Sequence, residues 1–148
     1  MKKSVKIVLS LCLFLLLFAI RAFETELFYD PLIDYFKNDY LYKKIYDIDF
    51  WPLIIHLLYR YVLNSMISLG LIWVIFERQE YIRFSVIFFV LAFSMLIIVF
   101  IYLLKDNFQG GYLLLYYVRR FIIHPIFVLL LLSLFYYQKL IANNLTKN

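Results

Sequence analysis

The chain has 148 residues, of which 66% are hydrophobic and 17% are charged, and its formal net charge is +5 at pH 7. Soluble domains are roughly half apolar and about a quarter charged, so this composition excludes a water-soluble monomer and predicts an integral membrane protein with lipids as partners. The basic residues are scattered beside apolar runs and form no stripe that could follow phosphates, which argues against a nucleic-acid partner.

Four apolar stretches predict a single membrane domain over residues 1–148, an all-α polytopic protein with four transmembrane helices. Each stretch is near or above the ~20 residues that a helix needs to cross ~30 Å of hydrocarbon. Their side chains do not alternate strictly between polar and apolar, as the strands of a membrane barrel would. The predicted spans are residues 5–23, 51–76, 82–104 and 112–138, with a C-terminal tail over 139–148.

The first span begins like a secretory signal peptide, because Lys2, Lys3 and Lys6 precede an apolar run. No cleavage pattern of small residues ends that run, and Arg21 stands where one would be expected, so we predict an uncleaved helix. The three lysines favour a cytoplasmic N-terminus by the positive-inside tendency. With four spans the C-terminus is also cytoplasmic, and residues 24–50 are external.

The external segment, residues 24–50, is acidic and aromatic, and most of the carboxylates of the chain lie in it. It has no apolar run long enough to cross a membrane. Asp30 followed by Pro31 is typical of a helix start, so we expect an amphipathic segment that rests its aromatic face at headgroup level. An interfacial aromatic belt is expected to include Trp51, Tyr59, Tyr61, Tyr116 and Tyr117.

The second span carries a polar stripe of His56, Arg60, Asn64 and Ser68, spaced four residues apart. At about 100° per residue, each of these side chains lies only ~40° around the helix from the last. A polar stripe facing lipid would be costly, so we expect it to face other helices or a wet cavity.

The fourth span repeats this pattern with Arg119, Arg120 and His124. Arg120 and His124 share a face at a spacing of four, and Pro125 is expected to disturb the helix locally. Under the predicted topology these groups lie toward the external side, where Arg21 at the end of the first span joins them. The sequence therefore predicts a basic cluster opposite the acidic external segment.

Two interpretations of this cluster stand side by side. In the structural one, the arginines reach the interface and pair with nearby carboxylates, while Asn64 and Ser68 hydrogen-bond a neighbouring helix. In the functional one, planar guanidinium groups bind a lipid phosphate, a substrate carboxylate or acidic groups of a partner protein. The candidate binding residues are His56, Arg60, Asn64, Arg119, Arg120, His124, Glu24 and Asp30.

No catalytic residue, metal or cofactor is predicted. His56 and His124 have no firm third ligand, so a metal site is disfavoured. Cys12 is the only cysteine and falls in the cytoplasmic half of the first span, away from the histidines, which disfavours a Cys/His nucleophile. We expect it to be a buried, inert thiol.

Three segments resemble the exosortase F-associated membrane proteins: RAFETELFYDPLIDYFK (21–37), RYVLNSMISL (60–69) and YYVRRFIIHPIFVLLLLSLFYYQKL (116–140). The most specific parts are the string Glu24–Pro31, Arg60 with Asn64, and Arg119-Arg120. The resemblance implies a small bacterial inner-membrane protein associated with a protein-sorting system. In such a system the exosortase is a multispanning Cys/Arg/His transpeptidase that acts on C-terminal sorting helices at the outer face of the membrane.

The resemblance does not make this chain the sortase, because the chain is short and Cys12 does not lie near the external arginines and histidine. The leading hypothesis is therefore a non-enzymatic accessory protein that binds the exosortase or its sorting-segment substrate. The alternatives are a membrane-embedded transferase or hydrolase acting on a lipid-linked substrate, and a small transporter subunit.

Overall fold

The computed structural model describes residues 2–28, 30, 32, 37, 49–105, 112–124 and 126–145 of the chain. Within that part the chain is built from α-helices without strands, so the predicted all-α class is confirmed there. The helices are α1 (Lys3–Ala22), α2 (Glu24–Leu27), α4 (Phe50–Phe76), α5 (Gln79–Lys105), α6 (Tyr112–Ile123) and α7 (Ile126–Leu145).

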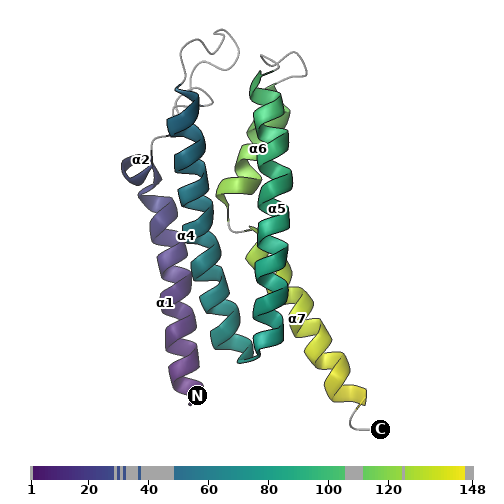
Figure 1. Ribbon diagram of the computed structural model, residues 1–148. Helices are drawn as coiled ribbons and strands as arrows, with labels where there is room; N and C mark the ends of the chain where they lie inside the picture. The colour runs from purple at the N-terminus through teal and green to yellow at the C-terminus, as the bar shows by residue number, and fades with distance from the viewer. Residues whose placement is uncertain are drawn as a thin grey trace.

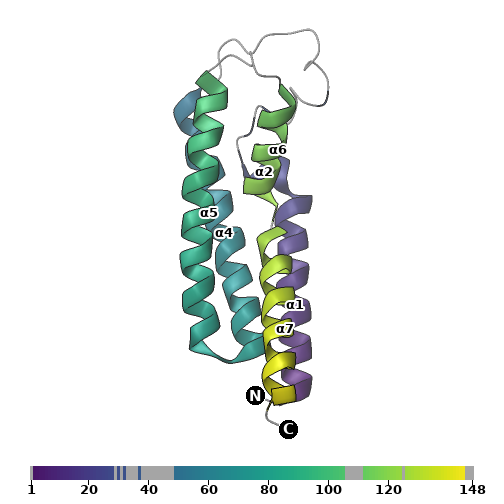
Figure 2. The same ribbon diagram turned by 90° about the vertical axis from the view of Figure 1, so that its right-hand side faces the viewer.

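Helix α4 is the centre of the bundle. It contacts α1 on one side and α5, α6 and α7 on the other, and Figures 1 and 2 show α1, α4 and α5 running side by side. The start of α1 and the end of α7 lie at the same end of the bundle as the α4–α5 turn (Figure 1). Because α4 has neighbours on two sides, it buries the longest series of side chains, from Leu53 to Phe76.

Helices α1, α4 and α5 are each long and apolar enough to cross a membrane. Helices α6 and α7, which fill the stretch predicted as one span over 112–138, pass that test only as a pair and are bent by 60° at their junction. The described part of the chain thus holds three such helices, or four if the bent pair counts as one span. These helices are compatible with a multi-pass membrane protein.

The turn between α4 and α5 is fixed by Glu77, which ends α4 in the left-handed conformation at φ 52°. Its backbone N–H donates to the carbonyl of Trp73 at 2.9 Å, the bond that closes a helix in this way. The Glu77 carboxylate also pairs with the Lys6 ammonium of α1 at 2.8 Å. This hydrogen bond from Lys6 lowers the pKa of the Glu77 carboxyl from its ordinary value of 4.5.

Two expectations about individual side chains are wrong. Tyr61 does not belong to an interfacial belt: it is buried between α4 and α5, where its hydroxyl donates to the Phe89 carbonyl at 2.8 Å. Trp51 and Tyr59, by contrast, are exposed. Cys12 is exposed and not buried, because α1 packs on α4 along one side only and leaves the rest of its surface open.

Most of the predicted external segment lies outside the described residues, and so does the amphipathic helix expected from Pro31 onward. Of its start, the structure shows that the Asp30 carboxylate accepts the backbone N–H of Leu32 at 3.2 Å. An aspartate at a helix N-cap makes this bond to the second residue of its helix. The bond is the one expected at the predicted helix start, and the helix itself stays a prediction because its residues lie outside the described part of the chain.

Candidate functional site

Arg119 of α6 forms a buried ion pair with Asp30. Its Nη2 lies 2.5 Å from Oδ2, and its Nε donates to the same oxygen at 3.1 Å and to Oδ1 at 3.3 Å. Only 7% of the Arg119 side chain and 3% of the Asp30 side chain are exposed. Two donors directed at one carboxylate give the pair a defined geometry as well as charge attraction. The pair joins the chain after α2 to α6.

Arg60 of α4 makes the second pair, donating from Nη2 to Oε2 of Glu24 on α2. The guanidinium is 2% exposed and lies over the ring of Phe28, with its central carbon 5.4 Å from the ring centroid. Its Nε and Nη1 have no hydrogen-bond acceptor among the described residues. Glu24 is 27% exposed, so this pair is less enclosed than the first.

The rest of the polar stripe on α4 is engaged in helix packing. Asn64 donates from Nδ2 to the carbonyl of Ile123 at 3.0 Å, and Ser68 donates to the carbonyl of Asn64 at 2.6 Å. The Ile123 carbonyl lies at the end of α6, where the helix no longer supplies a donor. Asn64 therefore satisfies a helix terminus inside the bundle. His56, the first member of the stripe, is half-buried one turn away and does not line the cavity described below.

His124 lies at the junction of α6 and α7. Its N–H donates to the Arg120 carbonyl at 3.0 Å, and its own carbonyl accepts the N–H of Ile126 at 2.8 Å, which closes a tight turn. Proline follows it in the sequence and has no N–H to continue a helix. Nη1 of Arg21 is 2.5 and 2.7 Å from the two ring nitrogens of His124. A guanidinium only donates and a neutral imidazole has one nitrogen that accepts, so one of these two contacts is a hydrogen bond and the imidazole is neutral in this arrangement.

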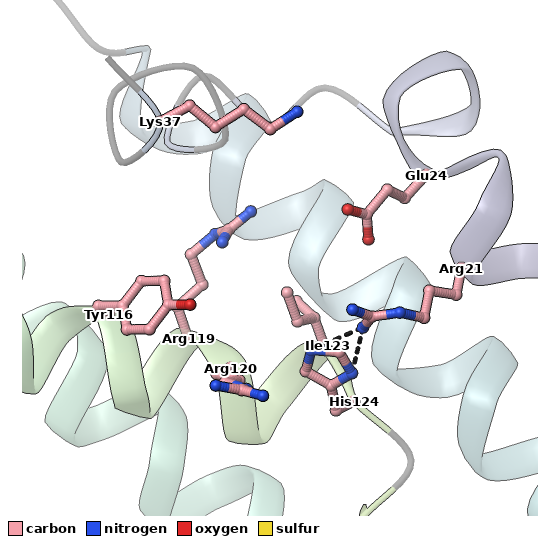
Figure 3. Close-up of a pocket in the computed structure, with 8 residues that line it drawn as sticks. All are labelled: Arg21, Glu24, Lys37, Tyr116, Arg119, Arg120, Ile123 and His124. Atoms are coloured by element: carbon pink, nitrogen blue, oxygen red, sulfur yellow. Dashed lines mark hydrogen bonds between the residues drawn. The ribbon is translucent and has the colours of Figure 1, made fainter. Parts of the chain in front are cut away.

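A cavity of about 250 Å³ lies between the end of α1, the start of α2 and the last turns of α6 (Figure 3). Arg120 is exposed in it, and the side chains of Arg120 and Lys37 make no hydrogen bond or ion pair with the residues that the structure describes. Figure 3 shows these two side chains reaching the opening from opposite sides. The lining residues are Arg21, Glu24, Lys37, Tyr116, Arg119, Arg120, Ile123 and His124.

The structure thus brings most of the predicted site residues to one region, and divides them into two groups. Arg60, Asn64 and Arg119 are buried and hold other parts of the chain. Arg120 faces the cavity, and its side chain has no hydrogen-bond or ion-pair partner among the described residues. Lys37 was not among the predicted site residues. Its position in an acidic, aromatic segment gave no sign that it would reach over α6.

These features define an all-α protein with helices apolar enough for membrane spans and a cationic cavity near the ends of α1 and α6. Comparison with protein-family models, with curated proteins and with solved structures gives no match for this chain.

Proposed function

We propose that this chain is a four-span, non-enzymatic accessory protein of an exosortase-type sorting system in the bacterial inner membrane. It binds the exosortase or the sorting segment of its substrate. The four spans are α1, α4, α5 and the bent pair of α6 and α7, and the segment from Glu24 to Phe50 is external. The name of the system rests on the sequence resemblance, and the non-enzymatic role rests on the geometry of the polar side chains.

The non-enzymatic role is supported by one observation: the titratable side chains at the cavity that could act as a base, Glu24 and His124, are each held by an arginine. Catalysis of acyl or phosphoryl transfer needs a nucleophile or base positioned next to a reacting atom. The cavity is lined by neither serine, threonine nor cysteine among the described residues. Glu24 is held by Arg60, and His124 is held by Arg21. This arrangement suits a protein that binds and positions a partner.

The contacts among the three resembling segments support the same proposal. Glu24 and Asp30 belong to 21–37, and they pair with Arg60 of the second segment and Arg119 of the third. The second and third segments also meet directly, through Asn64 and the Ile123 carbonyl. Several of the residues that make the resemblance specific, namely Glu24, Asp30, Arg60, Asn64 and Arg119, therefore hold the three segments together.

Apolar surface for a membrane partner is available on α1 and α5. These helices flank α4, and the side chains on their outer faces, such as Leu15 and Met95, are largely exposed. In a bilayer such faces meet lipid or the helices of another protein with similar packing. A multispanning exosortase or a single sorting helix offers apolar transmembrane helices that can pack against these faces.

Co-purification tests the proposal. The tagged chain is extracted in a mild detergent from cells that also produce the exosortase and a sorting substrate. A stable complex with either is expected, together with loss of substrate sorting when the chain is deleted. Isolation of the chain alone, or turnover of a lipid-linked substrate by the purified chain, would contradict the proposal. An unrelated four-span protein of similar abundance controls for nonspecific association in the detergent.

A further inference from the structure

We infer that the cavity bounded by α1, α2 and α6 is a binding site for a phosphate group, supplied by a lipid headgroup or by free phosphate. The inference does not depend on the proposed role in sorting. It rests on the charge of the cavity, the donors left available in it, its depth in the bundle and its size.

The charge of the cavity is unbalanced. Among the described residues, four cationic side chains and one carboxylate line it, which leaves an excess of three positive charges in this part of the chain with His124 neutral. The two neighbouring groups just outside, Arg60 and Asp30, cancel each other and do not change this excess. Cations held together around one cavity repel one another. A bound anion relieves that repulsion.

Donors suited to such an anion are present in the described part of the chain. The Arg119 side chain is occupied by Asp30, whereas the side chains of Arg120 and Lys37 make no hydrogen bond or ion pair with other described residues. Figure 3 shows both side chains at the cavity, with Arg21 at the right of the view, next to His124. A guanidinium offers a planar fork of N–H groups and an ammonium offers three rotatable ones, and both bind phosphate oxygens well.

The length of α1 sets the depth of the cavity. Helix α1 has 20 residues and ends next to Arg21. At 1.5 Å per residue it is about 30 Å long, which matches the hydrocarbon thickness of a bilayer. It starts at the end of the bundle that holds the α4–α5 turn (Figures 1 and 2). Arg21 therefore falls at headgroup level, where lipid phosphates lie, and so does the wall of the cavity that it forms.

The size of the cavity favours a headgroup over a larger ligand. Its volume of about 250 Å³ is below the range of roughly 300–1,000 Å³ typical of sites for drug-sized molecules. The Glu24 carboxylate on its wall disfavours a carboxylate ligand presented at the same point. A phosphate can turn its several oxygens to Arg120 and Lys37 and away from Glu24.

Native mass spectrometry of the full-length chain in a mild detergent tests the site, with phosphatidylglycerol and inorganic phosphate as separate probes. Arg120→Gln is expected to weaken binding about 10- to 100-fold, the effect of losing a charge-assisted hydrogen bond. Lys37→Gln changes binding in the same direction. Both positions are exposed, so folding is retained, and an unchanged melting midpoint checks this. Arg78→Gln, in the turn at the opposite end of the bundle, is the matched control.

Phosphatidylglycerol binding that is lost in Arg120→Gln and kept in Arg78→Gln supports the site and identifies a lipid as the source of the phosphate. The same pattern with inorganic phosphate alone supports the site with a soluble ligand. Binding of neither probe, or equal loss in both variants, would overturn the inference. It would also be overturned if acetate bound and neither phosphate probe did, since that result points to acidic groups of a protein. None of these results depends on whether an exosortase co-purifies.

Discussion

Replacing Asp30 with asparagine tests the buried ion pair on which the site is built. The change keeps the shape of the side chain and removes its charge, so Arg119 is left cationic in a place where its side chain is 7% exposed. Removing one partner of a buried pair costs about 3–5 kcal/mol, because the remaining charge is desolvated without compensation. The folding equilibrium is then expected to fall by roughly 150- to 4,000-fold.

The double variant Asp30→Asn/Arg119→Gln measures how much of the lost stability comes from the interaction between the two side chains. It removes both charges, and loss of a whole buried pair is far less costly than loss of one member. We expect the double variant to be more stable than Asp30→Asn alone, with a coupling energy of at least about 2 kcal/mol between the two sites. Unfolding is followed by circular dichroism as a denaturing detergent is added to the protein in mild micelles.

The matched control is Glu77→Gln, which breaks the ion pair with Lys6 at the other end of the bundle. That carboxylate is solvent-exposed, so the control variant should unfold close to the wild type. The reasoning is refuted if Asp30→Asn is as stable as this control. It is also refuted if the effects at positions 30 and 119 simply add.

Three further outcomes are expected with the same assay. Glu24→Gln should be at least as destabilising as Asp30→Asn, because the charge left behind is on Arg60, whose side chain is 2% exposed against 7% for Arg119; a clearly smaller loss would contradict the burial of Arg60. Tyr61→Phe should lower the free energy of unfolding by about 0.5–1.5 kcal/mol, through the lost hydrogen bond to the Phe89 carbonyl, and no change would mean that this bond is not formed. Since the pKa of Glu77 is lowered in the folded chain, its pair with Lys6 stabilises the fold above pH 4.5 and is lost as the pH falls through the lowered value. Any difference between wild type and Glu77→Gln should therefore be present at pH 7 and vanish in acid, whereas a difference that persists at low pH would contradict the pair.

Much of this architecture follows from sequence, because the length of an apolar run sets the length of a helix in a membrane protein. The spacing of Arg60, Asn64 and Ser68 also predicts their common face, and all three are buried in the bundle. Spacing along one helix does not say which helix will face it. Which carboxylates pair with Arg60 and Arg119 depends on how α2 and α6 pack against the bundle. The sequence therefore predicts that a basic cluster faces an acidic segment, but not the individual ion pairs.

The junction at His124 shows a second limit. Proline at position 125 predicts a local disturbance of the helix but not its size, and the structure gives a bend of 60°. The bend depends on what satisfies the freed carbonyls, and here Asn64 of α4 supplies the donor for Ile123. The position of Tyr61 has a similar cause. Tyrosine near a span end is common at interfaces, but a backbone acceptor on α5 lets this hydroxyl be buried.

Thiol labelling from one side of the membrane tests the central claim, that the cationic cavity opens at the outer face. In a Cys12→Ser background, single cysteines replace Arg120 at the cavity and, separately, Arg78 at the α4–α5 turn. Spheroplasts are treated with a membrane-impermeant maleimide before and after permeabilisation. We predict that the cysteine at position 120 is labelled in intact spheroplasts and that the one at position 78 is labelled only after permeabilisation. The opposite pattern would place the cavity on the cytoplasmic side and contradict the account.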